Sequence, residues 1–241
     1  MKLELVSRDC KSLKDFCGLR VWKKPKEGIS YAIGVDVSEG VGGDASCAVV
    51  LDCRTGLHVA TYWNNLIDTD NFAAEIYKLG SWYHKAFLCI EANNHGHAVI
   101  AHLSGSIGGL TYPNLYKRIE FDEYTQRRTK KIGFVTGNRN SKIRLIENLK
   151  SALKSGETIT FDRFTIQELS SFVQDKKSGR MGAKGNAHDD RVMAYALAWE
   201  QARLIIEGQS LTHESNMPQM KYDPETGFPT GEAPDNPDSI F

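Results

Sequence analysis

The fold of this 241-residue chain is decided by Tyr31-Ala-Ile-Gly-Val-Asp36-Val-Ser-Glu-Gly-Val-Gly-Gly-Asp44. A short apolar run of β-forming residues ends in Asp36, and closely spaced glycines follow it. This pattern predicts a buried strand that carries an acidic side chain at its exposed end. A carboxylate beside apolar neighbours is costly unless a positive group, commonly a metal ion, compensates it. Asp36 is therefore a candidate metal ligand, and an aspartate that only caps a turn is the alternative.

The composition indicates a soluble globular protein without a uniformly basic surface. Lys and Arg number 30 and Asp and Glu number 30, so a basic coat for nucleic acid is excluded, although a local basic face is not. The five cysteines are odd in number and form no CxxC pair, which favours reduced thiols over a disulfide framework or a zinc knuckle. No apolar run approaches the ~18 residues that span a bilayer, and the N-terminus lacks a signal core. We therefore expect an intracellular protein with no membrane partner.

Three regions differ in composition. Residues 1–29 read as a lead-in or linker remnant, with one short helix near 12–17. Residues 30–207 form the predicted domain. Residues 208–241 hold five of the seven prolines and six acidic residues against one lysine, which is typical of a disordered acidic tail. Without this tail, the remaining body is mildly basic.

Three strands follow each other closely in the first part of the domain. Strands over 30–36, 46–51 and 58–63, with a tight turn over 52–56, predict an antiparallel meander. A helix then begins with Thr69 as its cap and ends near Tyr83, before a second acidic strand over 86–91.

A strand reached through a crossover helix usually lies parallel to its partner. If the strand over 86–91 pairs with the first strand, Glu91 lies ~5 Å from Asp36, the usual interstrand spacing. Two carboxylates at this distance repel each other, and a divalent cation between them removes the repulsion. His95 and His97 follow and are either ligands or solvated or capping residues. A helix from 96 to 103 completes this part.

The region 104–140 is the least regular. We expect a strand over 112–116, followed by a cluster of basic residues that includes Arg127 and Arg128. With Tyr116, Phe121 and Tyr124 nearby, this cluster either meets a phosphate backbone or is a solvated loop.

In the last part of the domain, the sequence predicts a basic hairpin that is followed closely by a helix with an acidic start. A helix capped by Asn140 or Ser141 runs to 154, and a hairpin over 172–184 carries four basic side chains, which are Lys176, Lys177, Arg180 and Lys184. His188-Asp189-Asp190 then opens an apolar helix over 191–207. These aspartates either cap the helix or present carboxylates beside the sheet.

The order of these elements resembles the ribonuclease H-like fold, a mixed α/β sheet with a three-strand antiparallel meander plus parallel strands, flanked by helices. More narrowly, the chain is similar to the nuclease domain of the large terminase subunit of tailed bacteriophages. The resemblance covers about residues 30–205 and rests on four motifs in order, which are Gly34-Val-Asp36-Val-Ser-Glu-Gly-Val-Gly-Gly-Asp44-Ala-Ser, Leu88-Cys-Ile-Glu91-Ala-Asn-Asn-His-Gly96, Pro113-Asn-Leu-Tyr116 and Ala187-His-Asp189-Asp190-Arg-Val-Met-Ala-Tyr-Ala-Leu-Ala.

The resemblance implies an endonuclease that cuts double-stranded DNA, during packaging of viral concatemers, with two Mg²⁺ or Mn²⁺ ions. It implies Asp36, Glu91 and Asp189 as the catalytic metal ligands, with Asp190 and Asp44 as additional candidates. It also implies a packaging ATPase domain or subunit, the small terminase and the portal as partners, in the cytoplasm of the infected host. Oxygen donors suit these hard cations on chemical grounds as well. The packaging ATPase that normally precedes this domain in terminases has no counterpart in this sequence.

Two other classes of function stay open. A phosphotransferase of the actin-like superfamily also begins with a strand, an aspartate and glycines, but it needs a second phosphate-binding hairpin and about twice the length. A non-catalytic interaction module on the same fold would tolerate loss of the acidic residues, yet all of them are present.

Overall fold

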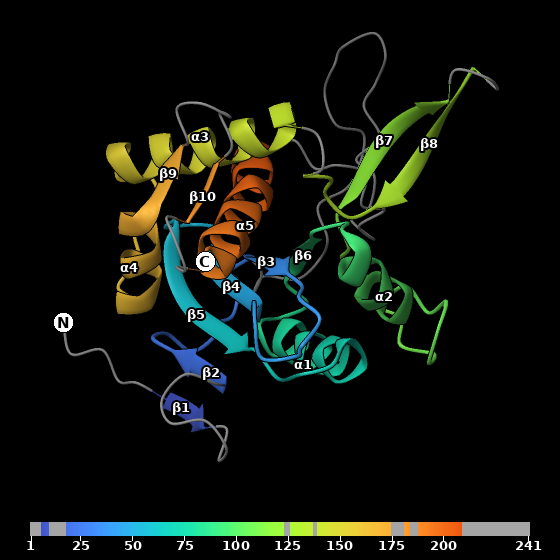
Figure 1. Ribbon diagram of the computed structural model, residues 1–241, viewed down its shortest axis with the longest axis horizontal. Helices are drawn as coiled ribbons and strands as arrows, with labels where there is room; N and C mark the ends of the chain where they lie inside the picture. Colours follow the sequence, from blue (N-terminus) through green and yellow to red (C-terminus); the bar gives the residue numbers. More distant parts are fainter. Residues whose placement is uncertain are drawn as a thin grey trace, which may run out of the picture. The chain divides into compact units, whose positions relative to one another are not determined.

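The structure is a computed structural model, and it describes residues 6–9, 18–122, 126–136, 139–174, 181–183 and 188–208. The short helix expected near 12–17 and the tail expected from 208 onward lie outside these residues, apart from Gly208 itself. The described part of the chain contains a six-stranded sheet with helices on both faces, as Figure 1 shows.

The central sheet has the strand order β1-β2-β5-β4-β3-β6. Its strands are β1 (Val6–Asp9), β2 (Gly18–Val21), β3 (Tyr31–Asp36), β4 (Ser46–Asp52), β5 (Leu57–Asn64) and β6 (Phe87–Ile90). Neighbours are antiparallel except β3 and β6, which are parallel with Val35 opposite Ile90. The expected meander and the expected parallel pairing are both confirmed.

Five helices and two short hairpins complete the described structure. The helices are α1 (Thr69–Trp82), α2 (Asn94–Leu103), α3 (Arg139–Ser155), α4 (Arg163–Ser171) and α5 (Asp190–Ile206). The hairpins are β7 (Lys117–Asp122) with β8 (Arg127–Ile132), and β9 (Phe172–Gln174) with β10 (Met181–Ala183). Figure 1 shows the β7–β8 hairpin extending away from the sheet and the helices.

The two faces of the sheet bury separate apolar clusters because successive strand residues point to opposite sides. On one face, Ile33 and Val35 pack with α1 and α2 through side chains such as Phe72 and Val99. On the other face, Ala32 and Val49 pack with α3 and α5. Asp36 shares the parity of Ala32, so its side chain is directed to the α5 side.

Helix α5 crosses β3 at Gly34, and this contact fixes where the helix begins. A Cβ atom at Gly34 would lie 2.0 Å from the Ala194 carbonyl oxygen and 2.1 Å from the Ala198 nitrogen. The absence of a side chain therefore lets the helix lie directly on the strand. As a result, the first residues of α5 lie beside the end of β3 that carries Asp36.

Several local predictions are wrong. The cap of α1 is Asp68 rather than Thr69, because its carboxylate accepts the Asn71 N–H at 2.9 Å. Residues 112–116 form no strand but only a single bridge, in which Leu115 pairs with Leu88. Helix α3 already includes Arg139, so neither Asn140 nor Ser141 is its cap, and the Ser141 hydroxyl instead donates to the Val135 carbonyl at 2.8 Å.

The structure also contains two elements that the sequence did not predict. The lead-in contributes β1 and β2 to the edge of the sheet, where β2 pairs with β5. The irregular basic region contains the β7–β8 hairpin. Strand β2 pairs with residues 60–63, far along the chain, and local sequence does not reveal such a partner.

Candidate metal centre

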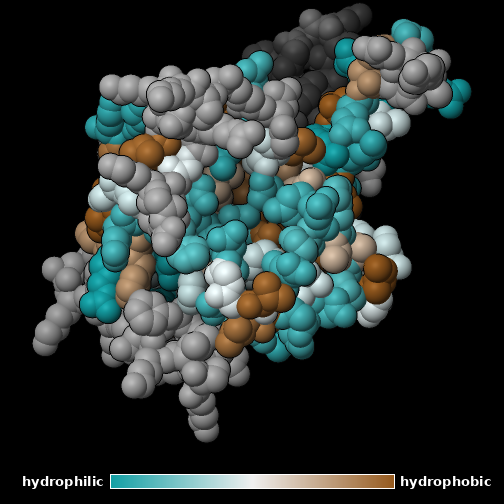
Figure 2. Space-filling view, in the orientation of Figure 1, coloured by the Kyte–Doolittle hydropathy of each residue, from teal (hydrophilic) through white to brown (hydrophobic). Residues whose placement is uncertain are grey.

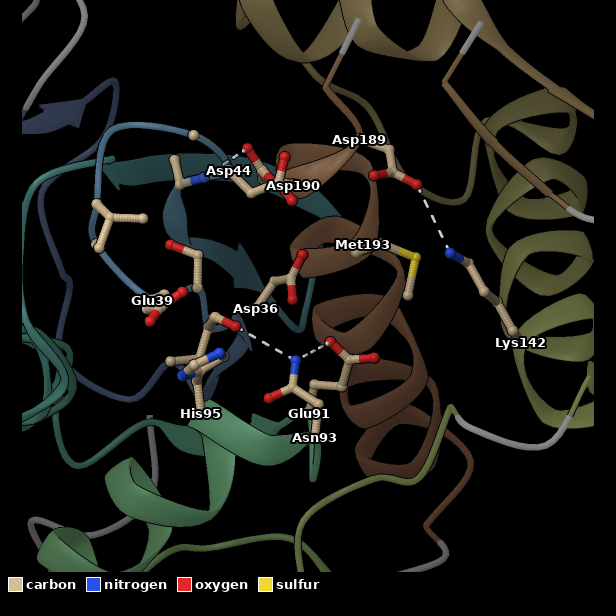
Figure 3. Close-up of a pocket in the computed structure, with 16 residues that line it drawn as sticks. Asp36, Glu39, Asp44, Glu91, Asn93, His95, Lys142, Asp189, Asp190 and Met193 are labelled. Atoms are coloured by element: carbon tan, nitrogen blue, oxygen red, sulfur yellow. Dashed lines mark hydrogen bonds and ion pairs between the residues drawn. The ribbon is translucent and has the colours of Figure 1, made fainter. Parts of the chain in front are cut away.

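A cavity of about 500 Å³ opens at the ends of β3 and β6 and at the start of α5. Six carboxylates line it, together with His95, Asn93 and Lys142, as Figure 3 shows. Five of them are the candidate ligands Asp36, Asp44, Glu91, Asp189 and Asp190, and the sixth is Glu39. All five acidic residues expected from the sequence therefore lie around one cavity.

Asp36 and Glu91 lie at neighbouring strand ends, as the parallel pairing requires. The Glu91 N–H donates to the Val35 carbonyl at 2.9 Å, directly before Asp36. Burial raises the pKa of Asp36 well above its usual range, and Glu91, Asp190 and Asp189 raise it further. The protein thus holds a carboxylate where its negative charge is unfavourable unless a cation is bound.

Two side chains hold the Glu91 carboxylate in place. The Asn93 amide Nδ2 donates to Glu91 Oε2 at 3.0 Å, and the Thr136 hydroxyl donates to Glu91 Oε1. The same Asn93 amide also donates to the Val37 carbonyl at 3.3 Å. Figure 3 shows both bonds of the Asn93 amide. Sequence reasoning missed both residues. The contact of Thr136 with Glu91 joins segments 45 residues apart, whereas Asn93 lies only two residues after Glu91 and was the local signal that could have been used.

The aspartates at the start of α5 are not its caps. Asp189 stands at the capping position but makes no capping hydrogen bond through its side chain. The Arg191 N–H instead donates to Glu168 Oε2 at 2.8 Å, from α4. Asp190 accepts the Ala45 N–H at 3.0 Å, across the loop that follows β3. Neither aspartate therefore caps the helix through its side chain.

Asp189 and Asp190 have different surroundings. Asp190 is buried, and this burial raises its pKa to about 6 although the Ala45 N–H favours the charged form. The Asp189 side chain is partly exposed, and Lys142 Nζ lies 3.6 Å from its Oδ2. In Figure 3 Asp190 is directed toward Asp44, whereas Asp189 is directed toward Lys142.

A second group of donors lies beside Asp190. Atoms of Asp44, His188 and Asp190 lie within 4.8 Å of one another, close enough to hold one cation. His188 Nδ1 is 3.3 Å from Asp44 Oδ1 and 4.0 Å from Asp190 Oδ2. The adjacency of His188 to the two aspartates is the sequence signal for it. His95 lines the main cavity, whereas the exposed His97 does not.

Of the residues expected to contact DNA, four lie outside the part of the chain that the structure describes and two lie on β8. Lys176, Lys177, Arg180 and Lys184 lie outside the described residues. The strands on either side of the predicted turn, β9 and β10, pair as expected. Arg127 and Arg128 are exposed on β8.

The fold and the carboxylate-lined cavity define a ribonuclease H-like domain with a candidate metal centre at the strand ends. Residues 33–201 match the family model described as the terminase RNaseH-like domain, which is more than half of the chain. The chain therefore belongs to this family of phage DNA-packaging nuclease domains. The structure describes no helix that is both long enough and apolar enough to cross a membrane.

Solved structures agree with the fold. The large terminase nuclease from thermophilic phage G20c with bound magnesium is 24% identical, with a TM-score of 0.61 over 76% of this chain and 87% of that one. The large terminase nuclease domain of Thermus phage P74-26 is 23% identical, with a TM-score of 0.58 over 76% of this chain and 85% of that one. No curated protein sequence matches the chain.

Proposed function

We propose that this chain is a metal-dependent endonuclease that hydrolyses phosphodiester bonds of double-stranded DNA and cuts viral concatemers during genome packaging. The observation that carries the proposal is the convergence of six carboxylates, including the five candidate ligands, on one cavity at the ends of β3 and β6 and the start of α5. Such a concentration of negative charge is unfavourable in a protein without bound cations, and it is the donor set that hard divalent cations require.

Asp36, Glu91 and Asp189 are the proposed ligands of two Mg²⁺ or Mn²⁺ ions. Asp190 is an additional ligand and Asp44 a further candidate. When bound, two such ions activate a water molecule and stabilise the charge on the attacked phosphate and on the leaving oxygen. The residues of the chain set the positions of the donors. Asn93 and Thr136 orient Glu91, and the contact between α5 and Gly34 fixes the helix start beside Asp36.

The donor chemistry of the site fits the proposed ions. The five candidate ligands offer oxygen atoms, which Mg²⁺ and Mn²⁺ prefer, and no cysteine lines this cavity. The G20c nuclease has been solved with bound magnesium. This likeness supports the choice of metal for the present chain.

The remaining expectations belong to the same proposal. Residues 30–207 carry the nuclease activity, residues 1–29 are a lead-in or linker remnant, and the acidic tail 208–241 is dispensable for cleavage. The partners are the packaging ATPase, as a domain or a separate subunit, the small terminase and the portal, in the cytoplasm of the infected host. Membership of the terminase family favours this function over an actin-like phosphotransferase.

Nicking of supercoiled plasmid by the purified chain tests the proposal. We expect cleavage with Mg²⁺ or Mn²⁺ and none with Ca²⁺, because Ca²⁺ accepts longer and looser oxygen shells. The Glu39→Gln variant is the matched control, since Glu39 also lines the cavity but is not a proposed ligand. Full activity in excess chelator would contradict the metal mechanism. A folded protein that binds Mn²⁺ but does not cut DNA would indicate a non-catalytic module.

A further inference from the structure

The base of the β7–β8 hairpin is attached to β6, and the segment that follows β8 reaches the candidate metal centre. Directly after β8, the Phe134 N–H donates to the Ile90 carbonyl at 2.7 Å, and the Ala92 N–H donates to the Phe134 carbonyl at 2.7 Å. Two residues later, Thr136 contacts the Glu91 carboxylate. The base of the hairpin is therefore attached to the strand that carries Glu91.

The strand register gives the hairpin two different faces. Residues directly opposite each other in an antiparallel pair lie on the same face, and alternate residues lie on opposite faces. The register pairs Lys117 with Ile132, and the pattern continues along both strands. One face, called here the apolar–basic face, carries Lys117, Ile119, Phe121, Arg128, Lys130 and Ile132. The other, called the paired face, carries Arg118, Glu120, Arg127, Thr129 and Lys131.

The paired face neutralises much of its own charge. Glu120 lies 2.7 Å from Arg118 Nη2 and 2.6 Å from Lys131 Nζ. Arg118 also donates to the carbonyls of Ile132 and Gly133 at 2.8 Å, which ties it to the base of the hairpin. Through these contacts, the charged residues of the paired face stabilise the hairpin itself.

The apolar–basic face has no such compensation. Lys117, Arg128 and Lys130 are exposed, and no ion pair involving them is found among the residues that the structure describes. Ile119 and Phe121 lie on the same face as these basic residues, and their exposed fractions are 57% and 55%. Figure 2 shows hydrophobic and hydrophilic residues side by side on this hairpin, at the upper right. This face thus carries three cations, no acidic residue, and exposed apolar side chains among the cations. Such a surface favours a binding partner that is a polyanion and that also offers apolar surface.

We propose that the apolar–basic face of the β7–β8 hairpin binds the DNA duplex beside the cleavage site. Lys117, Arg128 and Lys130 contact phosphates, while Ile119 and Phe121 pack against sugars or the edge of a base step. A strand of six residues extends ~20 Å, which matches about six base pairs of duplex. The charge of this face favours DNA over a protein partner. The proposal rests on the nuclease function and names the surface that holds its substrate.

Two double variants on β8 test this proposal with matched charge changes. Arg128→Gln with Lys130→Gln removes two cations from the apolar–basic face, and Arg127→Gln with Lys131→Gln removes two from the paired face. All four residues are exposed and lie within five positions of one another. Binding of a fluorescent duplex of random sequence is measured by anisotropy in chelator, over a range of salt concentrations.

We expect the first variant to bind more weakly and to lower the log–log salt slope by up to ~1.8, about 0.9 for each phosphate that the protein no longer neutralises. The second variant should change both quantities by less than half as much. Equal effects of the two variants, or no effect of either, would overturn the proposal. A partner protein on this face also predicts no effect, since only DNA is present.

A third variant separates the apolar contact from the charges. Phe121→Ser should weaken binding without changing the salt slope, because the substitution leaves every cation of this face in place. Unchanged affinity would remove the apolar part of the proposal. Circular dichroism of each variant checks the fold. Plasmid nicking by the unmodified chain tests the nuclease function separately, so failure of the hairpin proposal and failure of that function give different results.

Discussion

Asn93 donates a hydrogen bond from Nδ2 to Glu91 Oε2 at 3.0 Å, while its Oδ1 accepts the Gly96 N–H at 2.7 Å. One side chain thus caps α2 and holds a proposed metal ligand at the end of β6. Gly96 fits closely against this turn, since a Cβ there would lie 1.8 Å from the Glu91 carbonyl oxygen. The start of α2 and the orientation of Glu91 are therefore linked through one amide.

Substitutions of Asn93 separate these two tasks. Asn93→Ser keeps a good helix cap but loses the amide that reaches Glu91, so we expect near-normal stability and a metal affinity lowered ~10–100-fold, as for other residues that orient ligands. Asn93→Ala should lose the same affinity and about 1 kcal/mol of stability as well. Mn²⁺ titration by calorimetry and urea unfolding measure the two effects. Normal metal affinity in Asn93→Ser would show that Asn93 acts only as a cap.

Asp36→Asn should abolish cleavage without unfolding the protein. The raised pKa of Asp36 shows that its charged form is disfavoured in the metal-free protein, so a neutral amide is expected to raise the melting temperature in chelator. Cleavage should fall by more than ~100-fold, the upper end for loss of a residue that only orients a ligand. Plasmid nicking and thermal unfolding test the two parts. Activity within a few-fold of the unmodified chain would exclude Asp36 from the metal centre.

The sequence predicted the elements whose signal is local or periodic. The strand before Asp36, the parallel strand before Glu91 and the apolar helix after Asp189 each show a pattern within one segment, and strand pairing then brings their acids together. The contacts of Thr136 with Glu91 and of Glu168 with Arg191 join segments 45 and 23 residues apart, which no local pattern reports. The β7–β8 hairpin was missed because charged residues occupy most of both strands and hide the alternation.

Asp189 and Asp190 should differ in stability when replaced by alanine. Asp190→Ala removes the acceptor of the buried Ala45 N–H, so we expect a loss of ~1–3 kcal/mol in the free energy of unfolding. Asp190→Asn keeps an acceptor and should retain most of that stability. Asp189→Ala should change stability by less than ~0.5 kcal/mol because the side chain makes no cap and is partly exposed.

Cleavage by the same variants orders their catalytic importance. Family resemblance predicts that Asp189→Ala lowers cleavage more than Asp190→Asn does. Plasmid nicking at saturating Mn²⁺ measures this order, and urea unfolding of each variant excludes loss of fold. The reverse order would make Asp190 the principal ligand of the pair.

His58 should make folding stability depend on pH. It is fully buried, with Nε2 near the Thr61 hydroxyl at 2.7 Å and Nδ1 near the Thr160 hydroxyl at 2.8 Å. Burial lowers its pKa to about 4, against ~6.5 in the unfolded chain. The unfolded state therefore binds a proton first as the pH falls. His58 should cost about 2 kcal/mol of stability between pH 7 and pH 5.

The His58→Gln variant isolates this effect. It lacks the titrating ring, so its stability should fall less between pH 7 and pH 5, although it is less stable at both values. Urea unfolding of the two proteins at each pH gives the difference directly. An equal fall in both would show that His58 titrates alike in the folded and unfolded states.

Strand β6 is the last strand of the sheet, yet its outer edge is closed to other chains. The Leu88 N–H and carbonyl bond to Asn114 and Tyr116, and further along the Ile90 carbonyl and the Ala92 N–H both bond to Phe134. Exposed strand edges invite pairing with a foreign strand and aggregation. Here two short segments occupy the edge of β6. Neither segment forms a strand, so neither creates a new exposed edge. The edge that carries Glu91 is thereby protected from β-augmentation by a foreign strand.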